Sequence, residues 1–118
     1  MLELTTQLTT SPKPLPSSDN LGFGQYFTDH MFTARFQEGR GWSEAKIVPY
    51  GPLSIDPGAS VFHYGQSLFE GMKAFRQESG RLVLFRPEFN QRRLQDGAAR
   101  LCLEAPPPEL FLQAVREL

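Results

Sequence analysis

Hydrophobic and polar positions alternate along several stretches in the middle of the chain. Residues 26–36 and 46–50 are rich in β-branched and aromatic side chains and lie on either side of a glycine-containing turn, which predicts two strands. Residues 68–76 alternate in the same way, and a turn at 78–80 leads from them to the apolar stretch 82–85. The pattern therefore predicts four strands, the last two of which form a hairpin.

Apolar positions at helical spacing follow the predicted strands. Pro87 suits the first turn of a helix over residues 87–103, the prolines at 106–108 interrupt the chain, and residues 110–118 form a second amphipathic helix. A shorter helical stretch is predicted at 60–67. This order indicates an α+β fold, with helices packed on one face of a mainly antiparallel sheet.

Residues 1–20 differ in composition from the rest of the chain. They are rich in Ser, Thr and Pro, which predicts an extended or disordered N-terminal arm. Residues 21–118 are then a single small domain, since a chain of 118 residues is close to the commonest domain size. The last helix reaches Leu118 without a glycine or a helix breaker, so we expect this domain to be truncated before a larger one.

Charge and cysteine content narrow the range of partners and compartments. A net charge of −1 argues against nucleic acid or an anionic membrane surface as the main partner. Cys102 is the one cysteine, which excludes a disulfide within the chain and fits a reducing compartment. The chain shows no secretion signal and no apolar stretch of membrane-spanning length, so we expect a cytoplasmic protein. Two histidines and one cysteine give no metal-binding spacing.

The helix predicted after Pro87 carries two adjacent arginines, Arg92 and Arg93. The guanidinium group of arginine is a rigid fork of donors that suits a phosphate. Arginine pairs on helices are more often a solvated face or members of surface ion pairs, so the pattern alone leaves both interpretations open. Gly97 lies one turn beyond Arg93 on the same helix face, where another group could approach closely.

Residues 63–75 have the composition of a pocket wall. Gly71 has no side chain, so a ligand or another backbone can come close there. Tyr64 could orient a ligand through its hydroxyl group or be an ordinary half-buried tyrosine, and strand phenylalanines such as Phe69 are more often core residues. Lys73 could form a Schiff base, but a solvated or ion-paired lysine is the commoner case.

Two other candidate sites are rejected, one because of strand geometry and one because histidines of its kind are more often structural than catalytic. Asp29 and His30 are adjacent on a predicted strand, so their side chains point to opposite faces and cannot act as a catalytic dyad. His63 is assigned no role, because a histidine in this setting is more often structural than catalytic.

Three motifs, in order along the chain, resemble those of one enzyme family. Residues 23–31 (FGQYFTDHM) are similar to its F-G-x-x-F-T-D-H-M opening, and residues 63–75 (HYGQSLFEGMKAF) to its H-Y-x-x-x-L-F-E-G-M-K-A-F segment. Residues 84–94 (LFRPEFNQRRL) are similar to its L-F-R-P-x-x-N-x-x-R stretch. The family is that of the branched-chain amino-acid aminotransferases, which are pyridoxal 5'-phosphate (PLP) enzymes of fold type IV, and the resemblance covers their N-terminal small domain.

The resemblance implies roles for particular side chains. Arg93 is expected to bind the PLP phosphate, because the matching arginine of the family lies three residues after the asparagine, here Asn90; Arg92 is its neighbour. Four residues are expected to line the pocket for the substrate: Phe23, Tyr64, Phe69 and Gly71.

The resemblance also implies an activity and an assembly. The family transfers the amino group of leucine, isoleucine or valine to 2-oxoglutarate, giving branched 2-oxo acids and glutamate in branched-chain amino-acid biosynthesis. The expected assembly is a homodimer. The Schiff-base lysine of the family belongs to a large domain, so we expect it beyond Leu118 and assign no catalytic residue to this chain; Lys73 does not match its position.

Two alternatives stay open at this point. The chain could belong to another fold-type-IV PLP enzyme, such as a D-amino-acid aminotransferase or an aminodeoxychorismate lyase, although the first two motifs favour the branched-chain group. It could also be a small binding module without enzymatic activity, if the molecule ends at Leu118. Activity with L-leucine but not D-alanine would separate the enzyme classes.

Overall fold

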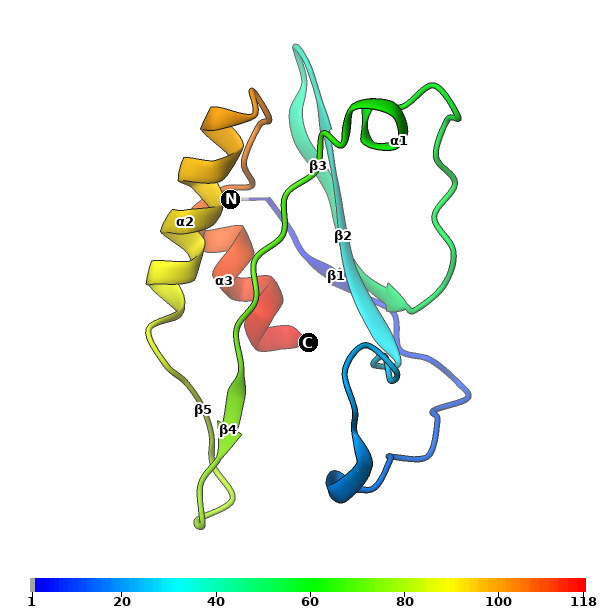
Figure 1. Ribbon diagram of the computed structural model, residues 1–118, viewed down its shortest axis with the longest axis vertical. Helices are drawn as coiled ribbons and strands as arrows, with labels where there is room; N and C mark the ends of the chain where they lie inside the picture. The colour runs from blue at the N-terminus through cyan, green and yellow to red at the C-terminus, as the bar shows by residue number, and fades with distance from the viewer. Residues whose placement is uncertain (1) are drawn as a thin grey trace. The chain divides into compact units, whose positions relative to one another are not determined.

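The computed structural model describes residues 2–118 (Figure 1). These residues divide into two compact units. The first unit contains the residues up to Leu53 together with Arg116–Leu118, and the second contains Ser54–Val115. Strands in small, mainly antiparallel sheets occur together with helices, which confirms the predicted α+β class. Within residues 2–118, none of the helices is long and apolar enough to cross a membrane.

The first unit is built on a three-stranded sheet with the order β1-β3-β2. Strand β2 (His30–Gln37) pairs antiparallel with β3 (Gly41–Pro49), and β1 (Thr5–Thr6) pairs parallel with β3. Both strands predicted in this part of the chain are present with shifted ends, since β2 starts four residues later than predicted and β3 starts five residues earlier. A short 3-10 helix, η1 (Ser18–Asn20), precedes β2.

The central strand β3 supplies the buried positions of this sheet. Ala45 and Ile47 are each 2% exposed, whereas Glu44 and Lys46 between and beside them are exposed. Alternation of this kind places successive side chains on opposite faces of the strand. One face of β3 is therefore apolar and the other carries charge.

The ladder between β2 and β3 contains a bulge. Thr33 pairs with Lys46 and Arg35 pairs with Ser43, so β3 has one residue more than β2 between these pairs. Glu44 lies in this stretch with a φ of 53°, in the left-handed region that glycine prefers. The bulge thus holds a charged residue in a strained backbone conformation.

Side chains at and just before the start of β2 bind the backbone of the N-terminal stretch. The amide of Thr9 donates to Nε2 of His30 at 2.9 Å, and the amide of Lys13 donates to Oδ1 of Asp29 at 3.1 Å. Asp29 and His30 thus bind separate backbone groups, in keeping with the argument against a catalytic dyad.

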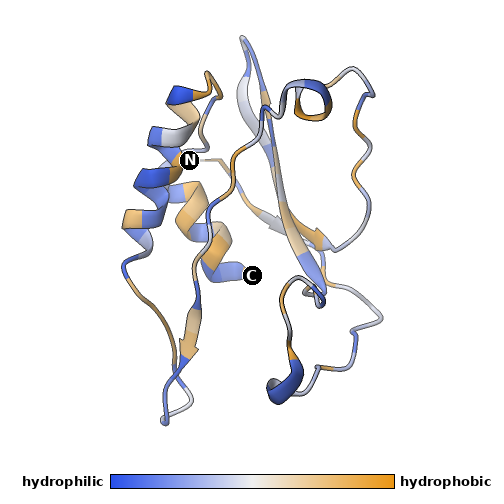
Figure 2. Cartoon of the chain, viewed as in Figure 1, coloured by the Kyte–Doolittle hydropathy of each residue, from blue (hydrophilic) through white to orange (hydrophobic). Residues whose placement is uncertain are grey.

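The second unit contains a hairpin and helices. Strands β4 (Ala74–Arg76) and β5 (Leu82–Leu84) form the predicted antiparallel hairpin. The helices are α1 (Ser60–Tyr64), α2 (Pro87–Arg100) and α3 (Pro108–Glu117), of which α3 belongs to this unit up to Val115. Figure 2 shows α2 as mostly hydrophilic, whereas α3 mixes hydrophobic and hydrophilic residues and ends in a hydrophilic turn.

The single strand predicted over residues 68–76 is wrong for most of its length. Only Ala74–Arg76 is a strand, and residues 68–73 have no regular secondary structure. The carbonyl oxygen of Gly71 accepts a hydrogen bond from the side chain of Asn90 on α2. Side chains of a helix therefore bind this segment, where the prediction assumed a continuous β-ladder.

Candidate functional site

The arginine singled out from the sequence, Arg93, forms an ion pair across the second unit. Its Nη2 atom lies 3.0 Å from Oε1 of Glu70. The Glu70 side chain is 6% exposed, whereas the Arg93 side chain is 61% exposed. A buried carboxylate thus binds a guanidinium group that still reaches solvent.

Asn90 completes this arrangement from the same helix. Its Nδ2 atom donates to Oε2 of Glu70 at 2.7 Å and to the carbonyl oxygen of Gly71 at 3.0 Å. Asn90 and Arg93 are three residues apart on α2 and so lie on one face of the helix. Each oxygen of the carboxylate therefore has its own partner, and we call Glu70, Asn90 and Arg93 the Glu70 cluster.

The Glu70 cluster leaves donors of Arg93 available to a ligand. A guanidinium group has five N–H donors, and the contact with Glu70 engages only one of its nitrogens. The remaining donors belong to a largely exposed side chain, and a planar fork of this kind suits the oxygens of a phosphate. The donor chemistry of Arg93 therefore fits the phosphate group of PLP.

The neighbouring arginine has different surroundings. Arg92 lines a cavity of about 210 Å³ together with Arg86, Glu88 and Phe89. The guanidinium carbon of Arg86 lies 5.3 Å from the centre of the Phe89 ring, a cation–π contact. Arg92 and Arg93 therefore take part in separate groups of residues, although they are adjacent in sequence.

Three of the four predicted pocket-wall residues lie in the same unit as Arg93. Tyr64 ends α1 and is 86% exposed, and Phe69 is 90% exposed. Gly71 has open space where a side chain would stand. The structure brings Phe69 and Gly71 to the Glu70 cluster, since they flank Glu70 in sequence and Gly71 accepts a hydrogen bond from Asn90.

The fourth predicted residue, Phe23, lies in the first unit. It stands in a loop between Gly22 and Gly24, whose φ angles are 61° and 67°. Its side chain is fully exposed. Left-handed residues on both sides turn the chain sharply and present this phenylalanine outward.

Two further sequence expectations have structural answers. A Cβ atom on Gly97 would lie 2.8 Å from Cδ1 of Leu68, so the group that approaches closely at Gly97 is the side chain of Leu68. Nε2 of His63 lies 2.7 Å from the carbonyl oxygen of Pro57, a contact that joins α1 to the preceding loop. Gly97 thus serves packing, and His63 has a structural contact.

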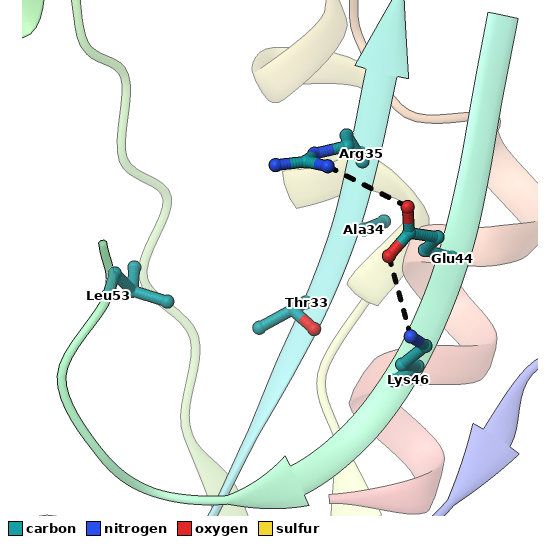
Figure 3. A pocket seen from close by; sticks show the side chains of 6 residues that line it. All are labelled: Thr33, Ala34, Arg35, Glu44, Lys46 and Leu53. Carbon is teal, nitrogen blue, oxygen red and sulfur yellow. Dashed lines mark hydrogen bonds and ion pairs between the residues drawn. The ribbon is translucent and has the colours of Figure 1, made fainter. Parts of the chain in front are cut away.

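A second group of charged residues surrounds the bulge in the first unit (Figure 3). Glu44 lies 3.8 Å from Arg35 and 3.4 Å from Lys46, and we call these three residues the Glu44 cluster. They border a cavity of about 290 Å³ with Thr33, Ala34 and Leu53. The side chains of the Glu44 cluster are 46–74% exposed, and the predicted site residues lie elsewhere. The Glu70 cluster is therefore the stronger candidate site.

The comparisons with known proteins agree with the three motifs. The chain is 52% identical over 106 residues to branched-chain-amino-acid transaminase 1 of Bacillus subtilis, an alignment that covers 90% of this chain and 29% of that protein. The chain is therefore similar to a segment of the branched-chain aminotransferases. The second Bacillus subtilis branched-chain-amino-acid aminotransferase is 44% identical over 98% of this chain and 32% of its own length.

A relative from another genus gives the same result. The branched-chain-amino-acid aminotransferase of Mycolicibacterium smegmatis is 43% identical over 99% of this chain and 33% of its own length. No family model matches the chain. The chain thus spans about a third of the length of the curated branched-chain aminotransferases that it matches.

Sequence reasoning missed two members of the Glu70 cluster. Glu70 is only one polar position of the alternating stretch 68–76, and Asn90 serves only to choose between the two arginines. The available signal was the spacing of Asn90 and Arg93, which places a neutral donor and a cationic donor on one helix face. Two such donors predict a shared acceptor, but the spacing does not reveal that the acceptor is Glu70.

Proposed function

We propose that this chain is part of a PLP-dependent aminotransferase that acts on leucine, isoleucine and valine with 2-oxoglutarate as the amino acceptor. Residues 21–118 are its small domain, and residues 1–20 are an N-terminal arm. The observation that carries the proposal is the exposed guanidinium group of Arg93, bound on one side by Glu70. The names and identities of the curated relatives support the same activity.

Arg93 is the proposed ligand of the cofactor phosphate. Its exposed donors match a dianionic group, and charge-assisted hydrogen bonds of this kind contribute about 1.5–3 kcal/mol each. Arg92 is not assigned this role, because it belongs to the group formed with Arg86, Glu88 and Phe89.

Phe23, Tyr64, Phe69 and Gly71 are the proposed wall of the substrate pocket. Phe69 offers an exposed ring to an aliphatic side chain, and the open space at Gly71 admits a ligand close to the backbone. Tyr64 adds a hydroxyl group that can bind the polar end of 2-oxoglutarate. An apolar wall distinguishes substrates by about 1–3 kcal/mol per methylene, so such a pocket accepts all three branched-chain amino acids.

PLP supplies the electron sink that makes amino-group transfer possible. The residues of this chain bind its phosphate and contact the substrate side chain. The lysine that binds PLP covalently is proposed to lie outside these 118 residues. The enzyme is further proposed to be a cytoplasmic homodimer in branched-chain amino-acid biosynthesis.

Paired arginine variants test the phosphate assignment. In the intact protein that carries this chain, Arg93→Ala is expected to weaken PLP binding by at least about tenfold, while Arg92→Ala binds PLP as the unsubstituted protein does. Fluorescence titration with PLP measures both dissociation constants. Unchanged affinity in Arg93→Ala, with a loss in Arg92→Ala instead, would show that the wrong arginine was assigned.

A further inference from the structure

We infer that Glu70 is a positioning residue that orients Arg93 toward the cofactor phosphate. This inference rests on the proposed function and adds a residue to which no binding role was assigned. Glu70 reaches the cofactor only through Arg93, whose Nη2 atom lies 3.0 Å from Oε1 of Glu70. The sequence adjacency of Glu70 to Phe69 and Gly71 links the phosphate-binding side chain to the substrate wall.

An exposed arginine needs such a partner to have a defined orientation. The side chain has several rotatable bonds, and ordering it costs rotamer entropy. Arg93 is 61% exposed, so little packing restrains it. The ion pair with Glu70 therefore provides a restraint on its free end before the phosphate arrives.

Glu70 can restrain Arg93 because Glu70 is itself fixed. Its side chain is 6% exposed, and Oε2 accepts a hydrogen bond of 2.7 Å from Asn90. Asn90 is bound in turn to the carbonyl oxygen of Gly71 at 3.0 Å. A buried carboxylate with a partner for each oxygen has few alternative orientations.

The negative charge of Glu70 also repels the phosphate. This repulsion weakens phosphate binding, whereas the restraint of Arg93 strengthens it. Without Glu70, Arg93 would present its full positive charge but would lose its restraint. Distance decides between the two effects. Glu70 contacts Arg93 directly at 3.0 Å, whereas a phosphate bound to the exposed donors lies farther from Glu70, and both distance and solvent weaken that repulsion. We therefore expect the loss of restraint to dominate.

The test compares PLP with pyridoxal, which lacks the phosphate group. In the intact protein, Glu70→Gln is expected to weaken PLP binding by about tenfold and to leave pyridoxal binding nearly unchanged. In an Arg93→Ala background, Glu70→Gln is expected to cause no further loss of PLP affinity. Glu44→Gln is the matched control, since it removes a carboxylate from an exposed cluster with an arginine and should leave both affinities unchanged.

Each other outcome overturns the inference. Equal losses for PLP and pyridoxal would indicate a purely structural role for Glu70, and tighter PLP binding would make Glu70 a competitor of the phosphate. Loss in Arg93→Ala but none in Glu70→Gln would reject this inference alone. Unchanged PLP affinity in Arg93→Ala would reject the proposed phosphate ligand as well. If Glu70→Gln does not fold, Asn90→Ala, which removes the hydrogen bond to Glu70, provides the same comparison.

Discussion

Glu70 and Glu44 are both carboxylates paired with an arginine, but they lie in contrasting environments. Glu70 is 6% exposed and has partners at 3.0 and 2.7 Å, whereas Glu44 is 54% exposed and has partners at 3.8 and 3.4 Å. The Glu44 cluster is formed by neighbouring strands at a bulge (Figure 3). The Glu70 cluster joins an irregular segment to a helix 20 residues further along the chain.

This difference shows which of the two ion pairs can support a binding site. Exposed ion pairs contribute little, because water and salt screen them and long side chains move freely. A buried carboxylate must be bound on all sides, so its partners acquire fixed positions. A fixed Arg93 with free donors is suited to recognise a ligand, whereas the Glu44 cluster has the character of a solvated surface.

The largest expected difference concerns stability. Glu70→Ala removes the shared acceptor of Asn90 and Arg93 and should lower the free energy of unfolding by about 2 kcal/mol. Glu44→Ala should lower it by no more than about 0.5 kcal/mol, because its partners are hydrated already. Denaturant titration of the two variants measures both values, and equal losses would remove the distinction between the clusters.

The next effect concerns substrate preference beside Glu70. Phe69→Ala should change the ratio of kcat/KM for leucine over valine by about tenfold, since one methylene in a pocket is worth about 1–3 kcal/mol. Its stability should change by less than about 0.5 kcal/mol, because the ring is exposed. Phe85→Ala is the control, because Phe85 is also exposed but has no proposed contact with substrate. Equal losses for every amino acid would argue against a specificity role.

A smaller effect of opposite sign is expected at the bulge. Glu44→Gly relieves the backbone strain of the left-handed conformation at this position, which is worth about 1–2 kcal/mol. It also loses two exposed ion pairs. The net result should be a gain in unfolding free energy of about 0.5 kcal/mol or more. Glu44→Ala keeps the strain and should show no gain, so a gain in both variants would mean that strain is not the cause.

The smallest effect is expected where Leu68 meets α2. Gly97→Ala favours the helix by about 1 kcal/mol but places a Cβ atom against Leu68, so its net change should stay within about 1 kcal/mol. The same substitution combined with Leu68→Ala should stabilise relative to Leu68→Ala alone. A double-mutant cycle of unfolding free energies measures the coupling, and no coupling would show that the two residues do not compete for space.

Local signals made much of the second unit predictable. Pro87 marked the start of α2, and the turn after Arg76 gave the hairpin, because these features depend on residues close in sequence. The motif resemblance selected Arg93 and the wall residues, and these assignments stay predictions. The close approach expected at Gly97 is present, but the sequence did not show that the group would be Leu68, which lies 29 residues away in the chain.

Long-range pairing set the limit of prediction in both units. Residues 68–73 alternate like a strand, but hydrogen bonds from Asn90 replace the ladder, and nothing within the segment shows this. The parallel pairing of Thr5–Thr6 with β3 likewise depends on residues 41 positions apart. The role of Glu70 depends on partners on α2 that are distant in sequence, so the residues around Glu70 do not predict it.

The proposed aminotransferase activity is best tested by the visible absorption spectrum of the intact protein with PLP, recorded before and after L-leucine is added. The proposed function predicts that bound PLP absorbs in the visible range and that this absorbance falls as L-leucine converts the cofactor to its amine form. D-alanine should leave the spectrum unchanged. Absence of bound PLP, or a spectrum that responds to D-alanine and not to L-leucine, would contradict the assignment of a branched-chain aminotransferase.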